Sequence, residues 1–391
     1  MNDLLKDTLT ERADGAEPPA LDLDGIVSAG DRRIGRRRVT AILGGAVVTA
    51  AGITGGLSIA RRVDDRPAPA TPLPFTERRA TYAIGGEIHF GPDIISVAPH
   101  KVGAFVQTDA GFVFLTEDQN EIYVADRSGV RPLGKSAWRL TAGNHGNLVA
   151  WVEDGTKESQ SVVYDVAAGR EVVRTALGNK RGPMLDLVMG PRIPAIDGDA
   201  VYLGAINGLY RWDTSTGKNT FIAAEGLPNA VRGVSSGQYL YVDPAQHPQK
   251  VTRLLLGPSP KDTAGRAFPG RQGYLSPSGG YVVAGPADNM YGEPGAAALD
   301  LYAAKTGARL ALRHPDHPRL IFSQWLNDTT FTAVGLRPGK NSPVDLLTCS
   351  ATALTCEVSA EAFSTYTFDK TPPITTPFAV PLGTPIIQYF N

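Results

Sequence analysis

Two stretches of the sequence carry residue types that catalyse reactions or bind metals in other proteins. Residues 233–237 read GVSSG and fit the G-x-S-x-G pattern of a nucleophile elbow, which needs a strand before the serine and a helix after it. The strand-like run YLYV at 239–242 follows instead, so we interpret GVSSG as a turn between strands. His314, Asp316 and His317 offer metal-ligand atoms, but the neighbouring prolines indicate a surface loop and no further ligand is indicated.

Other enzyme signatures are missing. The sequence contains no phosphate-binding loop, no dinucleotide fingerprint and no H-E-x-x-H zinc motif. The stretches DGD at 197–199 and NDT at 327–329 are typical of hairpin turns. We therefore expect no catalytic residue, no metal site and no cofactor, and we predict that the chain is not an enzyme.

Cys349 and Cys356 are the two cysteines of the chain, with SATALT between them. If DLLTC and CEV are neighbouring strands, the two sulfurs face each other within reach of a disulfide. Such a bond persists outside the reducing cytoplasm, so we predict it for an exported domain. Two buried free thiols are the alternative, and the pair is too small for a four-cysteine zinc site.

One pattern of strands and turns recurs after residue 80. An alternating apolar strand carries an aromatic or leucine anchor, and a turn leads to the next strand. Successive anchors are 41, 46, 45, 47 and 45 residues apart, at Tyr123, Tyr164, Tyr210, Leu255, Tyr302 and Leu347. A period in the forties made of strands and turns is typical of β-propeller blades. A β-sandwich, the alternative, would not produce six copies at near-equal spacing.

A second strand precedes the anchor strand in each repeat. These strands are short and rich in β-branched and aromatic residues: FVFLT (112–116), LVAWV (148–152), AVYLG (200–204), YLYV (239–242), YVVAG (281–285) and TFTAV (330–334). Six hairpins are countable, and the segments 81–97 and 364–391 make a seventh blade if the chain ends pair and close the ring. The sequence therefore predicts an all-β, six- to seven-bladed propeller over residues 81–391.

This repeat resembles the WD40-like and TolB-like β-propeller proteins that many bacteria carry behind a single membrane anchor. The resemblance covers roughly residues 81–391 and rests on the repeat period and the hairpin shape. The Gly-His and Trp-Asp signatures of WD40 repeats are missing apart from Trp212-Asp213. The resemblance therefore implies an architecture, with a shallow face of loops that suits proteins, peptides or glycans, and assigns no activity.

A membrane segment is predicted from Val39 to Ala60. These 22 residues contain no charge, and at about 1.5 Å per residue their helix covers roughly the 30 Å of a bilayer core. A buried soluble helix of that length would show charged residues on one face. We expect one transmembrane helix at 39–60, after a tail at 1–38 and before a Pro- and Ala-rich linker at 61–80.

Arginines flank this segment unequally. Three follow it, diluted by two aspartates, and five precede it: Arg32, Arg33, Arg36, Arg37 and Arg38. Because positive residues stay in the cytoplasm, the tail is predicted inside and the domain at 81–391 outside.

A cleaved signal is the alternative to an anchor. A small-x-small site at 68–70 (APA) fits cleavage, and the arginine pairs invite a twin-arginine export signal. The 38 residues before the apolar segment are many for a cleaved leader. The residues VTA follow Arg38, where a twin-arginine signal has bulky apolar residues. Both features favour an uncleaved anchor.

The tail is acidic before its arginines. Up to Asp31 it has eight acidic and two basic residues, and Pro18-Pro19 separates two short amphipathic patterns. One interpretation is a disordered tail that carries an orientation signal. The other is a pair of segments that fold on a cytoplasmic protein partner. The layout also resembles that of membrane-anchored anti-sigma regulators.

The net charge of −1 argues against a nucleic-acid partner, which requires a basic face. The leading hypothesis is a membrane-anchored, extracytoplasmic propeller that acts as a non-enzymatic binding or scaffold module for an unknown protein, peptide or glycan. The alternative is a transmembrane regulator whose propeller senses a ligand outside and whose tail binds a cytoplasmic partner such as a sigma factor. A hydrolase or lyase with residues at the central channel is a third possibility.

Overall fold

The computed structural model divides the chain after Pro69, and its second unit, Ala70–Asn391, holds every described residue. The described residues are 75–118, 120–153, 159–176, 192–205, 208–223, 231–246, 252–285, 299–315, 317–339, 341–367 and 376–386. The predicted tail, its five arginines and the predicted transmembrane helix lie outside them. Among these residues, no helix has the length and apolar character needed to span a bilayer.

Strands make up the regular structure of the described chain. The first sheet has three strands, β1 (Thr81–Ile84), β2 (Glu87–Phe90) and β3 (Asp93–Ser96). A seven-stranded sheet follows, with its strands side by side in chain order: β4 (Val102–Thr108), β5 (Gly111–Thr116), β6 (Glu121–Asp126), β7 (Gly129–Ala142), β8 (Leu148–Glu153), β9 (Gln160–Asp165) and β10 (Arg170–Thr175).

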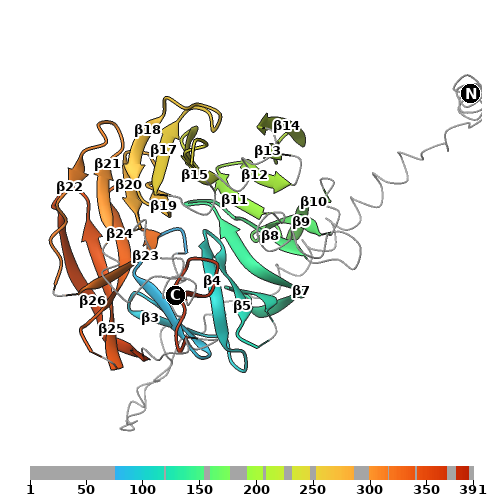
Figure 1. Ribbon diagram of the computed structural model, residues 1–391. Helices are drawn as coiled ribbons and strands as arrows, with labels where there is room; N and C mark the ends of the chain where they lie inside the picture. Colours follow the sequence, from blue (N-terminus) through green and yellow to red (C-terminus); the bar gives the residue numbers. More distant parts are fainter. Residues whose placement is uncertain are drawn as a thin grey trace, which may run out of the picture. The chain divides into compact units, whose positions relative to one another are not determined.

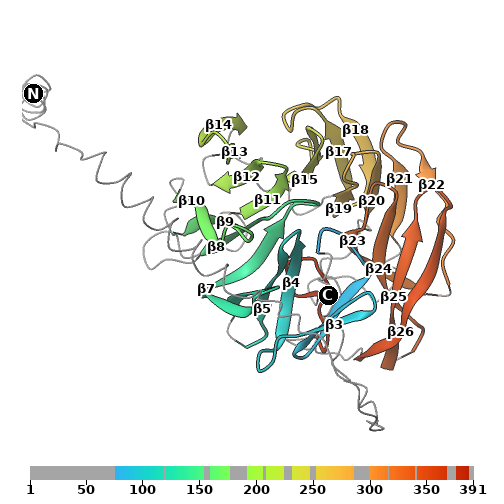
Figure 2. The ribbon, with the colours of Figure 1, turned by 180° about the vertical axis from the view of Figure 1, so that it is seen from behind.

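Four four-stranded sheets follow. Their strands are β11 (Arg192–Asp197), β12 (Ala200–Ala205), β13 (Gly208–Asp213) and β14 (Lys218–Ala223); β15 (Val231–Ser235), β16 (Gln238–Val242), β17 (Arg253–Gly257) and β18 (Arg266–Pro269); β19 (Gly273–Leu275), β20 (Tyr281–Ala284), β21 (Asp300–Ala303) and β22 (Arg309–Leu310); and β23 (Arg319–Trp325), β24 (Thr330–Leu336), β25 (Asn341–Ser350) and β26 (Thr355–Thr367). Each sheet is an antiparallel meander, and the sheets surround a common centre (Figures 1 and 2). This arrangement is a β-propeller.

The number of blades differs from the predicted six to seven. Five sheets have four or more strands, and we count these as five blades beside the three-stranded sheet. The difference arises at β7, whose 14 residues pair with β6 along the first half and with β8 along the second. The repeats anchored at Tyr123 and Tyr164 therefore share one continuous sheet. The all-β propeller is confirmed, and the predicted blade count is wrong.

The apolar core lies between neighbouring sheets. One cluster joins Val163 and Ala150 of the seven-stranded sheet to Val201 and Leu203 of β12, and similar clusters join the sheets that follow. Because both faces of a middle strand are covered in this way, every residue of β5 and of β12 is buried. The outer strand β26 is mostly exposed or half-buried, and β25 is its only neighbour within the sheet.

The two ends of the described chain meet. Ala83 of β1 and Ala379 exchange two backbone hydrogen bonds of 2.8 and 2.9 Å. Phe378, Val380 and Ile386 are buried in one apolar cluster with residues of β24 and β25. The described part of the C-terminal segment therefore contributes one bridge and buried side chains to the ring, where a full strand of a seventh blade was expected.

Replacing Phe378 with alanine tests the contribution of this segment. The ring is 2% exposed and contacts Phe363 edge-on, with centroids 5.3 Å apart. We expect Phe378→Ala to lower the free energy of unfolding in urea by about 3–5 kcal/mol, because a large buried side chain is removed. The control is Phe221→Ala, which removes a ring that is 51% exposed and should cost no more than about 1 kcal/mol. Equal losses would show that the C-terminal segment is not part of the core.

Candidate functional site

Each of the five sheets after the three-stranded one has its first strand toward the centre of the propeller (Figure 1). These innermost strands are β4, β11, β15, β19 and β23. The second half of β7, which precedes β8, occupies the corresponding place in the seven-stranded sheet. Residues of these strands line a cavity of about 180 Å³, together with Arg78 and with Pro381 and Leu382 near the C-terminus. We call this space the central cavity.

Four arginines gather at this site from four successive innermost segments. Arg139 lies in β7, Arg192 begins β11, Arg232 is the second residue of β15, and Arg271 lies two residues before β19. Arg139 and Arg232 line the central cavity. Each of the four therefore stands near the beginning of an innermost strand. We call them the arginine cluster.

Burial and the neighbouring arginine charges lower the pKa values of two members of the arginine cluster. Burial, followed by the charge of Arg139, lowers the pKa of Arg192 to about 10. Burial also lowers the pKa of Arg232 to about 10, and the charges of Arg192, Arg139 and Arg271 add to the effect. Both guanidinium groups stay protonated at neutral pH, so the cavity carries several positive charges close together in partly desolvated surroundings.

A fifth arginine at the cavity has a carboxylate partner. Arg78 forms a 2.8 Å ion pair with Asp109, and its side chain is 4% exposed. Burial lowers the pKa of Arg78, while the nearby Asp109 carboxylate acts in the opposite direction. Arg78 also donates a hydrogen bond to the carbonyl of Phe75. This pair holds the segment before β1 against the start of the β4–β5 hairpin turn.

Part of the cavity wall is aromatic. The rings of Tyr274 and Phe322 stack with centroids 4.2 Å apart, and Trp325 lies beside Phe322. Trp325 is 4% exposed, and its indole N–H has no hydrogen-bond partner among the described residues. The site thus offers a flat apolar surface with a buried donor at its edge.

Two further lining residues hold buried polar atoms without partners in the described chain. The Gln107 side chain donates to the carbonyls of Phe75 and Glu77, but its oxygen accepts no bond. The Ser323 hydroxyl, in β23, is likewise unpartnered. Leaving a buried polar atom unsatisfied costs about 1–3 kcal/mol, so such atoms at a cavity wall are available to a ligand. Together with the arginines, they suit a ligand that carries negative charge and polar groups.

These cavity residues were missed by reasoning from the sequence. A usable signal existed, since a basic residue stands near the start of four successive innermost strands, the last three at 192, 232 and 271. The signal was hidden because the innermost strands RIPAID, VRGVS and GYL lack long apolar runs. The anchor strands and the strands before them stand out instead, because they are buried on both faces.

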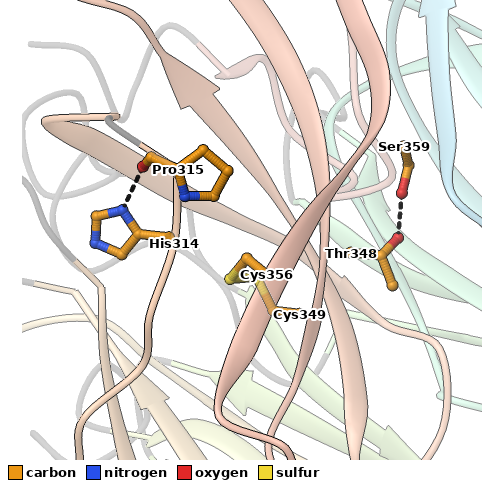
Figure 3. Close-up of a disulfide and its surroundings, with 6 residues drawn as sticks. All are labelled: His314, Pro315, Thr348, Cys349, Cys356 and Ser359. Carbon is orange, nitrogen blue, oxygen red and sulfur yellow. Dashed lines mark hydrogen bonds between the residues drawn. A yellow bond between two sulfur atoms is a disulfide. The ribbon is translucent and has the colours of Figure 1, made fainter.

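The structure describes two of the three residues that were considered as metal ligands and interpreted as a surface loop. His314 is exposed, as the surface-loop interpretation requires, and its ring lies 2.8 Å from the Pro315 carbonyl (Figure 3). For His317 the interpretation is wrong, because the side chain is 3% exposed. Asp316 lies outside the described residues. No group of three or more potential metal ligands occurs in the part of the chain that the structure describes.

His317 belongs to a buried network around Asp345. Its Nε2 lies 2.7 Å from the Asp345 carboxylate, which also accepts hydrogen bonds from Arg337 and from the backbone N–H of Ala362. Burial alone would raise the pKa of Asp345, but these hydrogen bonds and the Arg337 charge keep that pKa below its ordinary value. The network links β25 and β26 to the residues just before β23 and just after β24.

The GVSSG stretch is confirmed as a turn. Its first three residues end β15, and Ser236 and Gly237 turn the chain into β16 with positive φ angles of 51° and 72°. This geometry belongs to a two-residue hairpin turn. Ser235 donates a hydrogen bond to the carbonyl of Pro277. Gly233 and Val234, however, line the central cavity. The stretches at 197–199 and 327–329 likewise connect paired strands.

Cys349 and Cys356 lie opposite each other in the β25–β26 hairpin, in the register that the sequence analysis assumed. Their sulfurs are bonded at 2.03 Å in the structure (Figure 3). The Thr348 hydroxyl bonds that of Ser359 in the same hairpin, at 2.5 Å. The backbone N–H of Cys356 donates to the carbonyl of Arg313, which joins the connecting segment before β23 to β26. That this disulfide forms in an exported protein stays a prediction.

No protein-family model and no curated protein sequence matches this chain. Among solved structures, Hsv2 from Kluyveromyces lactis is similar at 8% identity, with 68% of this chain and 75% of that chain covered and a TM-score of 0.40. A puromycin-hydrolysing peptidase from Mycobacterium tuberculosis is similar at 12% identity, with 77% and 55% covered and a TM-score of 0.47. The tricorn protease is similar at 10% identity, with 70% and 33% covered and a TM-score of 0.42.

The prediction that the chain is not an enzyme is overturned by this comparison. It rested on missing sequence motifs, yet two of the similar structures are a peptidase and a protease. The absence of such motifs therefore does not exclude an enzyme of this architecture. At identities of 12% and 10% the likeness assigns no activity to this chain.

Replacing Cys349 with serine tests the disulfide. Exported wild-type protein, unfolded without reductant, should take up no thiol-reactive label. Cys349→Ser should take up one label, at Cys356, and lose about 2–3 kcal/mol of unfolding free energy, because the bond closes a short loop. The double variant C349S/C356S should be as unstable as reduced wild type. Two labels on the exported wild-type chain would show that the bond does not form.

Proposed function

We propose that this chain is a β-propeller binding module whose central cavity takes a ligand. The observation that carries the proposal is the convergence of Arg139, Arg232 and three unpartnered buried polar atoms on one enclosed space. Buried polar atoms cost stability unless a partner satisfies them. A scaffold that used the cavity only for packing would gain more from apolar side chains at these positions.

The proposed module is held outside a bacterial membrane by the apolar segment at 39–60. Its support is the run of 22 uncharged residues and the five arginines before it. In this arrangement the linker ends before Phe75, because Phe75 and Arg78 already pack against the propeller. The ligand then reaches the cavity from outside the cytoplasm.

A second candidate function is transmembrane regulation. The tail at 1–38 has two short amphipathic patterns and an abrupt change from acidic to arginine-rich sequence, which suits a segment that folds on a cytoplasmic protein. Ligand binding in the cavity would then be the input. This function and the anchored binding module require the same membrane topology.

A reporter fused after Asn391 tests that topology. A reporter that is active only outside the cytoplasm should be active there, and one that is active only inside should be silent. The control is the same pair of reporters fused after Asp31, before the arginines, where the pattern should be reversed. Activity of the cytoplasmic reporter after Asn391 would contradict the proposed location of the propeller.

Filling the cavity tests ligand binding. Gly233 lines the cavity, and a Cβ built on it meets no atom within 4 Å. Full-length protein in detergent is incubated with the small-molecule fraction of a cell extract, and retained compounds are identified by mass spectrometry. Wild type and Gly233→Ala should retain the same compound, and Gly233→Phe should lose it because its ring occupies the space.

The melting temperature of each variant without ligand is the control for folding. Gly233→Phe should melt near the wild-type temperature, because its side chain points into open space. Retention of the same compound by a folded Gly233→Phe protein would show that the ligand does not bind in the central cavity.

A further inference from the structure

We infer that the central cavity is an anion site that takes a small molecule bearing a carboxylate or phosphate group, with the arginine cluster as its receptor. This inference rests on the proposed function and adds the chemical class of the ligand. It is carried by the placement of the arginines, by their neighbours and by the polar atoms beside them.

The cluster is a local concentration of charge in a nearly neutral chain. The whole sequence has 38 basic and 39 acidic residues, so a general surplus of positive charge does not explain four arginines at one place. Like charges held close together in partly desolvated surroundings repel one another and destabilise the fold. Burial is the main cause of the lowered pKa values of Arg192 and Arg232, and the neighbouring arginine charges add to it. Such an arrangement is retained when it binds an anion.

The protein treats its other arginines differently. Elsewhere among the described residues, several arginines form ion pairs with carboxylates, as Arg131 does with Asp126, Arg174 with Glu153 and Arg309 with Asp300. Within the described chain, no carboxylate pairs with Arg139 or Arg192. Arg232 donates a hydrogen bond to the backbone carbonyl of Arg271, and the charges of three arginines add to burial in lowering its pKa. Among the described residues, the fold therefore places two arginines without a carboxylate partner at or near the cavity, and we assign them to an external anion.

Guanidinium groups match the geometry of an oxyanion. Each presents a planar fork of N–H donors that binds a carboxylate or phosphate through two parallel hydrogen bonds. Arg139 of β7 and Arg232 of β15 line the cavity, and Arg192 begins β11, which contacts both of these strands. Oxygens of one phosphate or carboxylate group placed there can accept from more than one arginine.

The polar and aromatic residues of the lining suit the rest of the ligand. The Trp325 indole N–H and the Ser323 hydroxyl are donors, and the Gln107 oxygen is an acceptor. The stacked rings of Tyr274 and Phe322 provide a flat apolar surface. These groups suit a ring that carries hydroxyl groups, so phosphorylated or carboxylated sugars are suitable probes. A cavity of about 180 Å³ limits the occupant to a small molecule or the end of a larger one.

Titration calorimetry on full-length protein in detergent tests this inference at constant ionic strength. The probes are glucose 6-phosphate, glucuronate, inorganic phosphate and neutral glucose. We expect saturable binding of at least one anionic probe, and binding of glucose at least roughly ten-fold weaker, because charge-assisted hydrogen bonds are lost. If glucose 6-phosphate and inorganic phosphate both bind more tightly than glucuronate, phosphate is the preferred group. If glucuronate binds more tightly than both, carboxylate is the preferred group.

Arg192→Gln is the decisive variant, and Arg170→Gln is its matched control. Arg170 is exposed at the start of β10, away from the cavity lining. Arg192→Gln should weaken the anion roughly ten-fold or more, while Arg170→Gln should change binding by less than about two-fold. Without ligand, Arg192→Gln should melt at or above the wild-type temperature because it removes repulsion. An arginine needed only for folding would lower the melting temperature when replaced.

Three results overturn the inference. They are the absence of saturable binding for every anionic probe, equal weakening by Arg192→Gln and Arg170→Gln, and a strongly lowered melting temperature of ligand-free Arg192→Gln. The proposed function is judged separately, by the compound that wild type retains and Gly233→Phe loses. If that compound is uncharged, the cavity is a ligand site and the anion inference alone is wrong.

Discussion

The covering of both faces of each sheet by neighbouring sheets is the constraint on which this structure depends. A meander of four short strands buries little apolar surface alone, so its stability comes from the clusters between sheets. Such stacking leaves two uncovered faces unless the sheets return to their starting point. The hydrogen bonds between Ala83 and Ala379, with the buried Phe378 beside them, join the first sheet to the last part of the chain.

The same packing creates the central cavity. The first strands of several sheets converge at the centre, and a space lined by aromatic and polar side chains is left between them. A polar ligand can enter this space, whereas the clusters between sheets are filled with apolar side chains. Polar and charged residues such as Gln107 and Arg232 are therefore tolerated at the centre at a smaller cost than in the clusters.

The arginine cluster and the Asp345 network show two ways of holding charge inside this fold. Asp345 is fully buried, yet Arg337, His317 and a backbone N–H satisfy its oxygens, so the network stabilises the packing of β24, β25 and β26. Arg139 and Arg192 have no carboxylate partner among the described residues, and their like charges oppose each other. In the first arrangement the protein itself satisfies the buried carboxylate, and for the second we infer that an anion does the corresponding work.

The sequence by itself determined the strand content and the propeller architecture. Middle and anchor strands such as AVYLG at 200–204 are buried on both faces, so burial forces an apolar, β-branched pattern that is visible without coordinates. The opposed positions of Cys349 and Cys356 also followed from local hairpin geometry. Only the tertiary structure decided the blade count, because the 14 residues of β7 bridge two repeats through pairings at both of its halves. It alone brought Arg139, Arg192 and Arg232 together, since residues 40 or more positions apart meet only when successive sheets pack side by side.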